Sequence, residues 1–147
     1  LVLVAGVGAG VGAGVKIENT DSRSVKLYNA AKAIAAHEIA LTELMIDGED
    51  NIKGLKDLKG IEIIGGEKNL NRKGLVSFRI NGIPSQVLVD FLNDKGIRTH
   101  VRKADHYSGN ILDPLGWEDC VRVSVCHYNS SEEIKSLLLA LNEFQLD

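Results

Sequence analysis

The sequence predicts an α+β fold, in which a small mixed or antiparallel sheet is covered on one face by helices. A long alanine-rich stretch over residues 22–47 has helical periodicity. Short β-branched stretches follow it, and several alternate between apolar and polar residues. Turn signals make neighbouring strands hairpin-like, and the apolar faces of the predicted helices suit one side of a sheet.

Length and composition indicate one ordinary globular domain. The chain has 147 residues, of which 44% are hydrophobic and 25% charged. Its net charge of -3, without a long basic run, gives no sign of a nucleic-acid partner. Two cysteines do not make a disulfide framework, so we expect a cytoplasmic protein. The first fifteen residues are too short and glycine-rich to span a membrane, and they lack the positive region of a signal peptide.

The first predicted element is one helix over residues 22–47, which ends at Gly48. Its apolar positions recur at helical spacing: Leu27, Ala31, Ile34, Leu41, Leu44 and Met45. The following residues 49–60 are polar and lysine-rich, and we expect a solvated loop or a short turn there.

Two strands come next, over residues 61–66 and 74–80, joined by a polar connection. Asn81 and Gly82 form a turn signal. A second helix begins at Pro84 and ends before Gly96. The apolar stripe of this second helix consists of Val87, Leu88, Phe91 and Leu92.

The C-terminal part is predicted as a strand, a long irregular segment, a strand and a helix. The first strand covers residues 97–103, and the second, over 120–128, alternates strongly between valines and polar residues. Ser130 and Glu133 have the spacing of a capping box at the start of the last helix. This capping box and the helix dipole account for the two glutamates there, so we do not assign them acid or base roles.

The irregular segment over residues 104–119 is the first candidate for a site. Segments of this length inside a compact domain are usually functional or disordered, and its His106, Tyr107 and Trp117 argue against disorder. We favour a site loop over a packed surface loop.

Arg122 is the second candidate. It lies within the alternating strand that follows the loop. An arginine there must be exposed, paired or directed at an anion, because an unpaired buried charge is costly. The pattern alone leaves two interpretations open: an exposed strand face shared with Ser124, or a guanidinium that binds a carboxylate.

Neither a metal site nor a cysteine nucleophile is predicted. Cys120 and Cys126 lie on one face of the same predicted strand, but about 20 Å apart by strand rise, too far to share a metal ion. Cysteines in a strand are more typical of the core or the sheet surface than of catalysis.

The first fifteen residues contain five glycines, Gly6, Gly8, Gly10, Gly12 and Gly14, all at even positions. Both the dinucleotide fingerprint and the P-loop need two glycines five residues apart, which this spacing cannot provide. Two other structures remain possible for this segment: a tightly packed helix of small residues, or a buried strand that runs into a loop. The chain begins at Leu1 inside this apolar run, so we expect a piece of a longer protein, or one with residues missing at its start.

Three separated motifs resemble the class V aminotransferase-fold enzymes, and within them the cysteine desulfurase and selenocysteine lyase group. The last strand and helix of this group resemble VRVSVCHYNSSEEIKSLLLALNEF, and the long helix leading into their small domain resembles AIAAHEIALTELMIDG. The stretch GLVSFRINGIPSQVLVDFLNDKGIRTHV resembles the strand, helix and strand that follow. The resemblance covers roughly residues 20–147, so these would form the small C-terminal domain of a fold-type I enzyme that uses pyridoxal phosphate (PLP).

The resemblance implies that PLP binds in a large domain upstream, which holds the Schiff-base lysine. No lysine here has the sequence context of that residue. We therefore expect no catalytic residue in this chain, no PLP on it alone and no activity alone. Residues 1–20 would be the end of the missing large domain, as a small-residue helix packed against it.

The resemblance also implies roles for single residues. Arg122 matches the arginine that binds the amino-acid carboxylate, and His106 and Tyr107 fall near the loop position where desulfurases have their sulfur-accepting cysteine. No cysteine occurs between Ile97 and Asp119, which puts persulfide transfer in doubt. The implied substrate is an amino acid such as cysteine or selenocysteine, and the implied assembly is a homodimer of the full-length protein.

Two other classes of function stay open. The chain could be a free-standing regulatory module that binds an amino acid or another small carboxylate, with Arg122 and the loop in the same roles. It could instead be a dimerisation or docking domain that uses the glycine-rich apolar segment.

Overall fold

The computed structural model of the chain describes residues 22–144, and it confirms the α+β prediction. The predicted glycine-rich segment over residues 1–20 lies outside the described residues. The elements, in chain order, are α1 (Arg23–Asp47), β1 (Gly48–Glu49), β2 (Ile52–Lys53), η1 (Leu55–Asp57), β3 (Ile61–Ile63), β4 (Leu75–Ile80), α2 (Ser85–Asp94), β5 (His100–Lys103), α3 (Gly109–Leu112), η2 (Asp113–Leu115), β6 (Asp119–Ser124) and α4 (Ser131–Phe144).

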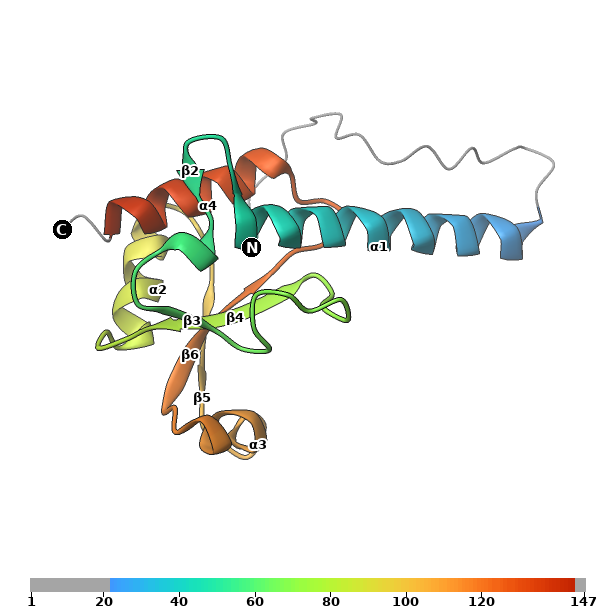
Figure 1. The fold of residues 1–147 in the computed structure, drawn as a ribbon. Helices are drawn as coiled ribbons and strands as arrows, with labels where there is room; N and C mark the ends of the chain where they lie inside the picture. Colours follow the sequence, from blue (N-terminus) through green and yellow to red (C-terminus); the bar gives the residue numbers. More distant parts are fainter. Residues whose placement is uncertain (1–21, 145–147) are drawn as a thin grey trace.

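The main sheet has four strands in the order β3-β4-β6-β5, and each neighbouring pair is antiparallel. Helices α1, α2 and α4 lie to one side of it, and the short α3 lies at the far end of β5 and β6 (Figure 1). The register places Arg122 of β6 between Ser77 of β4 and His100 of β5. The central strand β6 therefore presents Arg122 with a neighbouring strand on each side.

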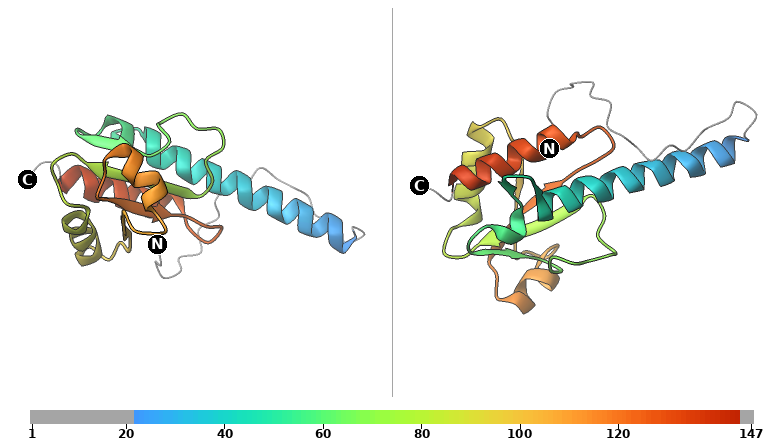
Figure 2. Two further views of the ribbon diagram at one scale, coloured as in Figure 1. Left: turned by 90° about the horizontal axis from the view of Figure 1, so that it is seen from below. Right: turned by 45° about the horizontal axis from the view of Figure 1, so that its top comes forward.

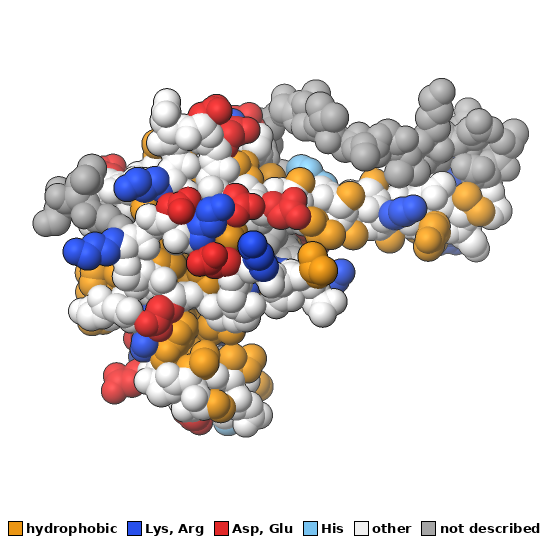
Figure 3. Space-filling view, viewed as in Figure 1, with side chains coloured by type: hydrophobic (Ala, Val, Ile, Leu, Met, Phe, Trp, Pro, Cys, Tyr) orange, Lys and Arg blue, Asp and Glu red, His pale blue; other side chains and the backbone are white. Residues whose placement is uncertain are grey.

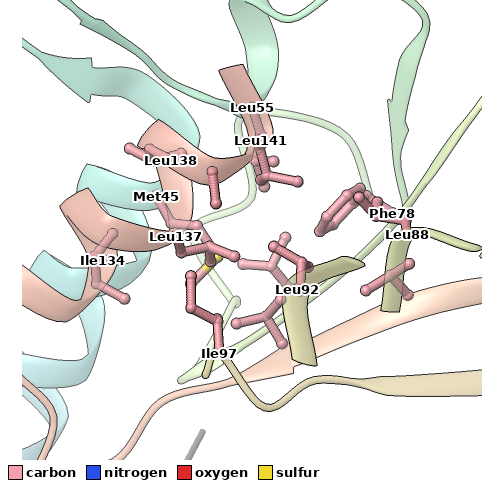
Figure 4. Packing of buried hydrophobic residues seen from close by; sticks show 14 of the residues in the cluster. Met45, Leu55, Phe78, Leu88, Leu92, Ile97, Ile134, Leu137, Leu138 and Leu141 are labelled. Atoms are coloured by element: carbon pink, nitrogen blue, oxygen red, sulfur yellow. The ribbon is translucent and has the colours of Figure 1, made fainter. Parts of the chain in front are cut away.

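The hydrophobic core fills the space between the sheet and these three helices. In β4 the buried residues alternate with half-buried or exposed ones, as the sequence pattern predicted. Figure 4 shows Phe78 of β4 facing leucines of α2 and α4. The largest buried side chains of this core are Phe78, Met45, Leu55, Leu88, Leu92, Ile134, Leu137, Leu138 and Leu141.

The predicted helix over residues 22–47 is confirmed, but its apolar stripe is buried only near the C-terminal end. Leu41 and Met45 lie in the core, whereas Leu27 is 60% exposed and Ile34 37%. The reason is that the first half of α1 extends beyond the sheet and the other helices, as the two further views also show (Figure 2). The helix ends at Gly48, where φ is +77° and favours glycine.

Three predicted strands are shorter in the structure because turns interrupt them. The predicted strand over 61–66 ends at Ile63, since Gly65 and Gly66 adopt positive φ. The one over 97–103 begins at His100, after Ile97 N–H has bonded back to Leu92 of α2 at 2.8 Å. The one over 120–128 ends at Ser124, and the chain then turns.

Two predicted loops contain short ordered elements. Residues 49–60 hold the β1–β2 hairpin and η1, with Leu55 fully buried. The segment 104–119 holds α3 and η2. In α2, Val87 is 51% exposed and Val89 is buried instead, which corrects the predicted stripe. The predicted capping box is confirmed, because Glu133 N–H donates to Ser130 Oγ at 3.3 Å and Ser130 N–H to Glu133 Oε2 at 3.2 Å.

Candidate functional site

A pocket of about 560 Å³ lies on the face of the sheet opposite the three core helices. Strands β4, β6 and β5 contribute its floor, and the α3 segment and the chain between β3 and β4 contribute its walls. Its lining residues are Ile64, Arg72, Leu75, Ser77, Arg102, Tyr107, Ser108, Ile111, Leu112, Cys120 and Arg122. This set contains three arginines and no aspartate, glutamate or lysine.

Arg122 projects from the floor of this pocket and is half-buried. Its Nε atom is buried and has no hydrogen-bond partner. No carboxylate among residues 22–144 lies within ion-pair distance of it. Burial, and to a smaller extent the charge of Arg102, lower the pKa of Arg122, yet a guanidinium stays charged at neutral pH. Arg122 is therefore a cation with unused donors facing an open pocket, the arrangement that an anionic ligand would complete.

The α3 segment is held in shape by Asp105. Its Oδ1 accepts hydrogen bonds from the N–H groups of Tyr107 and Ser108, at 2.9 and 3.0 Å. These bonds are the main reason that the pKa of Asp105 lies below its ordinary value. Tyr107 and Ser108 both line the pocket, so the segment predicted as a site loop lies beside Arg122. His106 is not among the lining residues, and its ring lies 3.9 Å from that of Tyr107 between centroids.

A second, smaller hydrophobic cluster supports the α3 side of the pocket. It consists of Leu112, Trp117 and Cys120, with Ile64 packed against it. Arg79 of β4 lies over the Trp117 ring at 4.3 Å and pairs with Glu62 of β3 at 2.9 Å. Hydrophobic side chains gather over this end of the molecule in Figure 3 as well. The cluster fixes α3 against the sheet and so positions Tyr107 and Ser108.

The two cysteines are both free thiols. Cys120 lines the pocket but is buried, and burial raises its pKa, with a further contribution from Asp119. It is therefore held as a neutral thiol, unlike a reactive cysteine. Within residues 22–144 no group of three or more His, Cys, Asp or Glu is placed to hold a metal ion. None of the helices described is long and apolar enough to cross a membrane.

Two arginines of the pocket, Arg72 and Arg102, are not among the residues predicted from the sequence. Arg102 could have been found, because it alternates with the predicted strand residues in the same way as Arg122. Arg72 had no such signal, since it lies in the connection between β3 and β4. Its Nη2 donates to the carbonyl oxygens of Ile64, at 3.1 Å, and Gly66. Burial lowers the pKa of Arg72, and its buried Nε has no partner.

Comparison with known proteins identifies the family. Residues 25–137 match the family described as aminotransferase class-V. A probable cysteine desulfurase of Pseudomonas putida is 31% identical over 113 residues, which is 77% of this chain and 25% of that protein. One from Halobacterium salinarum is 33% identical over 111 residues, covering 76% of this chain and 25% of its own length. The chain belongs to the aminotransferase class-V family, and it resembles cysteine desulfurases within it.

Solved structures show the same fold. The apo cysteine desulfurase from Thermococcus onnurineus superposes with a TM-score of 0.65 at 24% identity, covering 84% of this chain and 28% of that one. A cysteine desulfurase from Escherichia coli gives a TM-score of 0.61 at 20% identity, covering 74% of this chain and 24% of that one. The chain thus spans about a quarter of the length of the curated relatives it matches.

Proposed function

We propose that this chain is the small domain of a PLP-dependent enzyme related to cysteine desulfurases, and that Arg122 binds the α-carboxylate of its amino-acid substrate. The observation that supports this role is the buried, unpartnered Nε of Arg122 in a pocket without acidic residues. A guanidinium presents parallel N–H donors that match the two oxygens of a carboxylate. Such a ligand would supply the hydrogen bonds that Arg122 lacks.

The pocket residues do not by themselves fit PLP. Anchoring PLP as a Schiff base needs a lysine, and a partner for the pyridine nitrogen needs a residue such as aspartate. The pocket lining contains neither residue type. When bound, PLP acts as an electron sink for the substrate. We assign these residues to substrate binding alone, place the PLP site in the remaining length that the relatives have, and propose that this chain is inactive on its own.

The α3 segment beside Arg122 lacks the residue type that could accept sulfur from the substrate. Between Ile97 and Asp119 the sequence has no cysteine, and Tyr107 and Ser108 line the pocket from this segment instead. Cys120 also reaches the pocket, but its buried thiol has a raised pKa. We propose cysteine or selenocysteine as the first substrates to examine, in a cytoplasmic homodimer of the longer protein, without a persulfide on this loop.

The test measures carboxylate binding to this chain directly. L-Alanine and propionate are titrated into the 147-residue chain and into Arg122→Gln, followed by amide NMR shifts at constant ionic strength. We expect the substitution to weaken binding at least about tenfold, because it removes a charge-assisted hydrogen-bond pair. The matched control is Arg98→Gln, since Arg98 is exposed and lies outside this pocket. Equal affinities of the wild-type chain and Arg122→Gln would contradict the role of Arg122.

The alternative, a free-standing carboxylate-binding regulatory module, predicts the same binding by Arg122. The absorption spectrum of the longer protein incubated with PLP distinguishes this alternative from the small-domain proposal. A visible Schiff-base band in the longer protein, absent from this chain, supports the small-domain proposal. A longer protein without the band supports the regulatory module.

A further inference from the structure

Arg102 lies close to Arg122 on the same face of the sheet. The antiparallel register pairs His100 with Arg122 and Arg102 with Cys120. Cys120 is two residues from Arg122 on one strand, so both point to the pocket side. Arg102 and Arg122 are therefore diagonal neighbours on adjacent strands, a relation that places the two residues about 7–8 Å apart. Both line the same pocket.

No carboxylate is paired with Arg102 in the described part of the chain. Arg102 makes none of the ion pairs found among residues 22–144. Asp105 is near enough for Arg102 to contribute to its lowered pKa, but its Oδ1 is occupied by two backbone N–H groups. Arg102 in turn contributes to the lowered pKa of Arg122, as expected for two like charges at this spacing.

A ligand with one anionic group would pair with only one of these two arginines. A single carboxylate on Arg122 neutralises one cation, while Arg102 still faces the pocket without a partner. A second anionic group a few bonds away would find Arg102 at the spacing that the strand register provides. Arg72 is less suited to this role, because its Nη2 is already held by two backbone carbonyls.

We propose that the pocket binds an amino acid whose side chain ends in an acid, with the α-carboxylate on Arg122 and the side-chain anion on Arg102. This inference rests on the proposed function for the first contact only, and it names an acidic amino acid as substrate in place of the cysteine or selenocysteine proposed above. It makes Arg102 the residue that selects the substrate class, and the pocket volume of about 560 Å³ is large enough for such a ligand.

The test compares ligands that differ only in the second charge. L-Aspartate against L-asparagine, and L-glutamate against L-glutamine, are titrated into the 147-residue chain by amide NMR at constant ionic strength. We expect the acid to bind about tenfold more tightly than its amide in the pair whose length fits. Arg102→Gln should abolish this difference and leave the amide's affinity within about twofold. Arg98→Gln, which alters an exposed arginine outside the pocket, should keep the difference.

The possible results distinguish a failure of the Arg102 site from a failure of the proposed role of Arg122. If acid and amide bind equally in both pairs, or if Arg102→Gln weakens both equally, the second anion site is wrong. If the amides bind but Arg122→Gln does not weaken them, the carboxylate role of Arg122 is wrong instead. An unchanged amide spectrum of each variant, away from the pocket, shows that the fold is intact.

Discussion

His100 reports directly on the charge of the candidate site. It faces Arg122 across the β5–β6 pair, on the strand that also contains Arg102. His100 is exposed on β5, yet partial desolvation and then the positive charges of Arg122, Arg102 and Arg98 lower its pKa. Because three of these causes are cations, removing or neutralising one of them must move the pKa of His100 upward.

The first prediction therefore concerns the pKa of His100, measured by NMR titration of its ring protons. In the wild-type chain it should lie below the ordinary value of about 6.5. Arg122→Gln should raise it, because the substitution removes the positive charge that lowers this pKa most after desolvation. Arg79→Gln is the control, since Arg79 is paired with Glu62 and is not among the charges that act on His100. An unchanged pKa in Arg122→Gln would show that the two side chains do not interact.

The lowered pKa of His100 also predicts how the free energy of unfolding changes with pH. The unfolded chain binds the proton near pH 6.5, and the folded chain binds it only at lower pH. Folding is therefore penalised at pH values below the folded pKa, and the penalty disappears as pH rises to about 6.5. We expect His100→Asn to flatten this part of the urea-unfolding profile. The same slope in wild type and variant would assign the pH dependence to other groups.

At the scale of elements, a junction of hydrogen bonds around Asn129 fixes the chain that follows β6. The buried Asn129 accepts the N–H of Cys126 at 2.9 Å through Oδ1 and donates to Glu133 Oε2 at 2.7 Å. Its backbone oxygen accepts a hydrogen bond from His37 Nε2 of α1 at 2.8 Å. These bonds join the chain just after β6 to α4 and α1.

We expect Asn129→Ala to lower the free energy of unfolding by about 1–3 kcal/mol, because it leaves the Cys126 N–H without its partner inside the junction. Urea denaturation monitored by circular dichroism measures this change. The matched control is Asn110→Ala on the exposed side of α3, which should change stability by less than about 0.5 kcal/mol. Similar effects of the two substitutions would mean that the junction bonds are not specifically stabilising.

The elements also show what could be predicted from the sequence. The ends at Gly48 and Gly96 and the Ser130–Glu133 capping box are local signals, so their positions followed from residue type and spacing. The α3 turn has no such signal, because a four-residue helix depends on packing against Trp117 and Cys120. Arg72 was missed for the same reason, since tertiary contacts alone bring its loop to the pocket.

At the scale of the whole molecule, the first half of α1 is the least covered part of the fold. Val25, Leu27 and Tyr28 are between 43% and 68% exposed, although all three are large and apolar. This half extends away from the sheet (Figure 1), and its hydrophobic side chains are visible on the surface in Figure 3. Exposed apolar patches on a helix often mark a surface that contacts another part of the protein or a partner. Under the proposed function the rest of a longer protein would cover this helix, since the curated relatives are about four times as long as the matched region.

In the isolated chain we expect the outer half of α1 to associate with a second copy of the chain. We expect light scattering over a dilution series to give a mass above 15.9 kDa at high concentration, falling toward that value on dilution. Replacing Leu27 and Tyr28 by glutamine should shift this transition to higher concentration, because it removes apolar area from the contact. Leu139→Gln is the control, since Leu139 is 54% exposed on α4, away from the outer half of α1. A monomer at every concentration, or an equal shift in the control, would show that the outer half of α1 does not drive association.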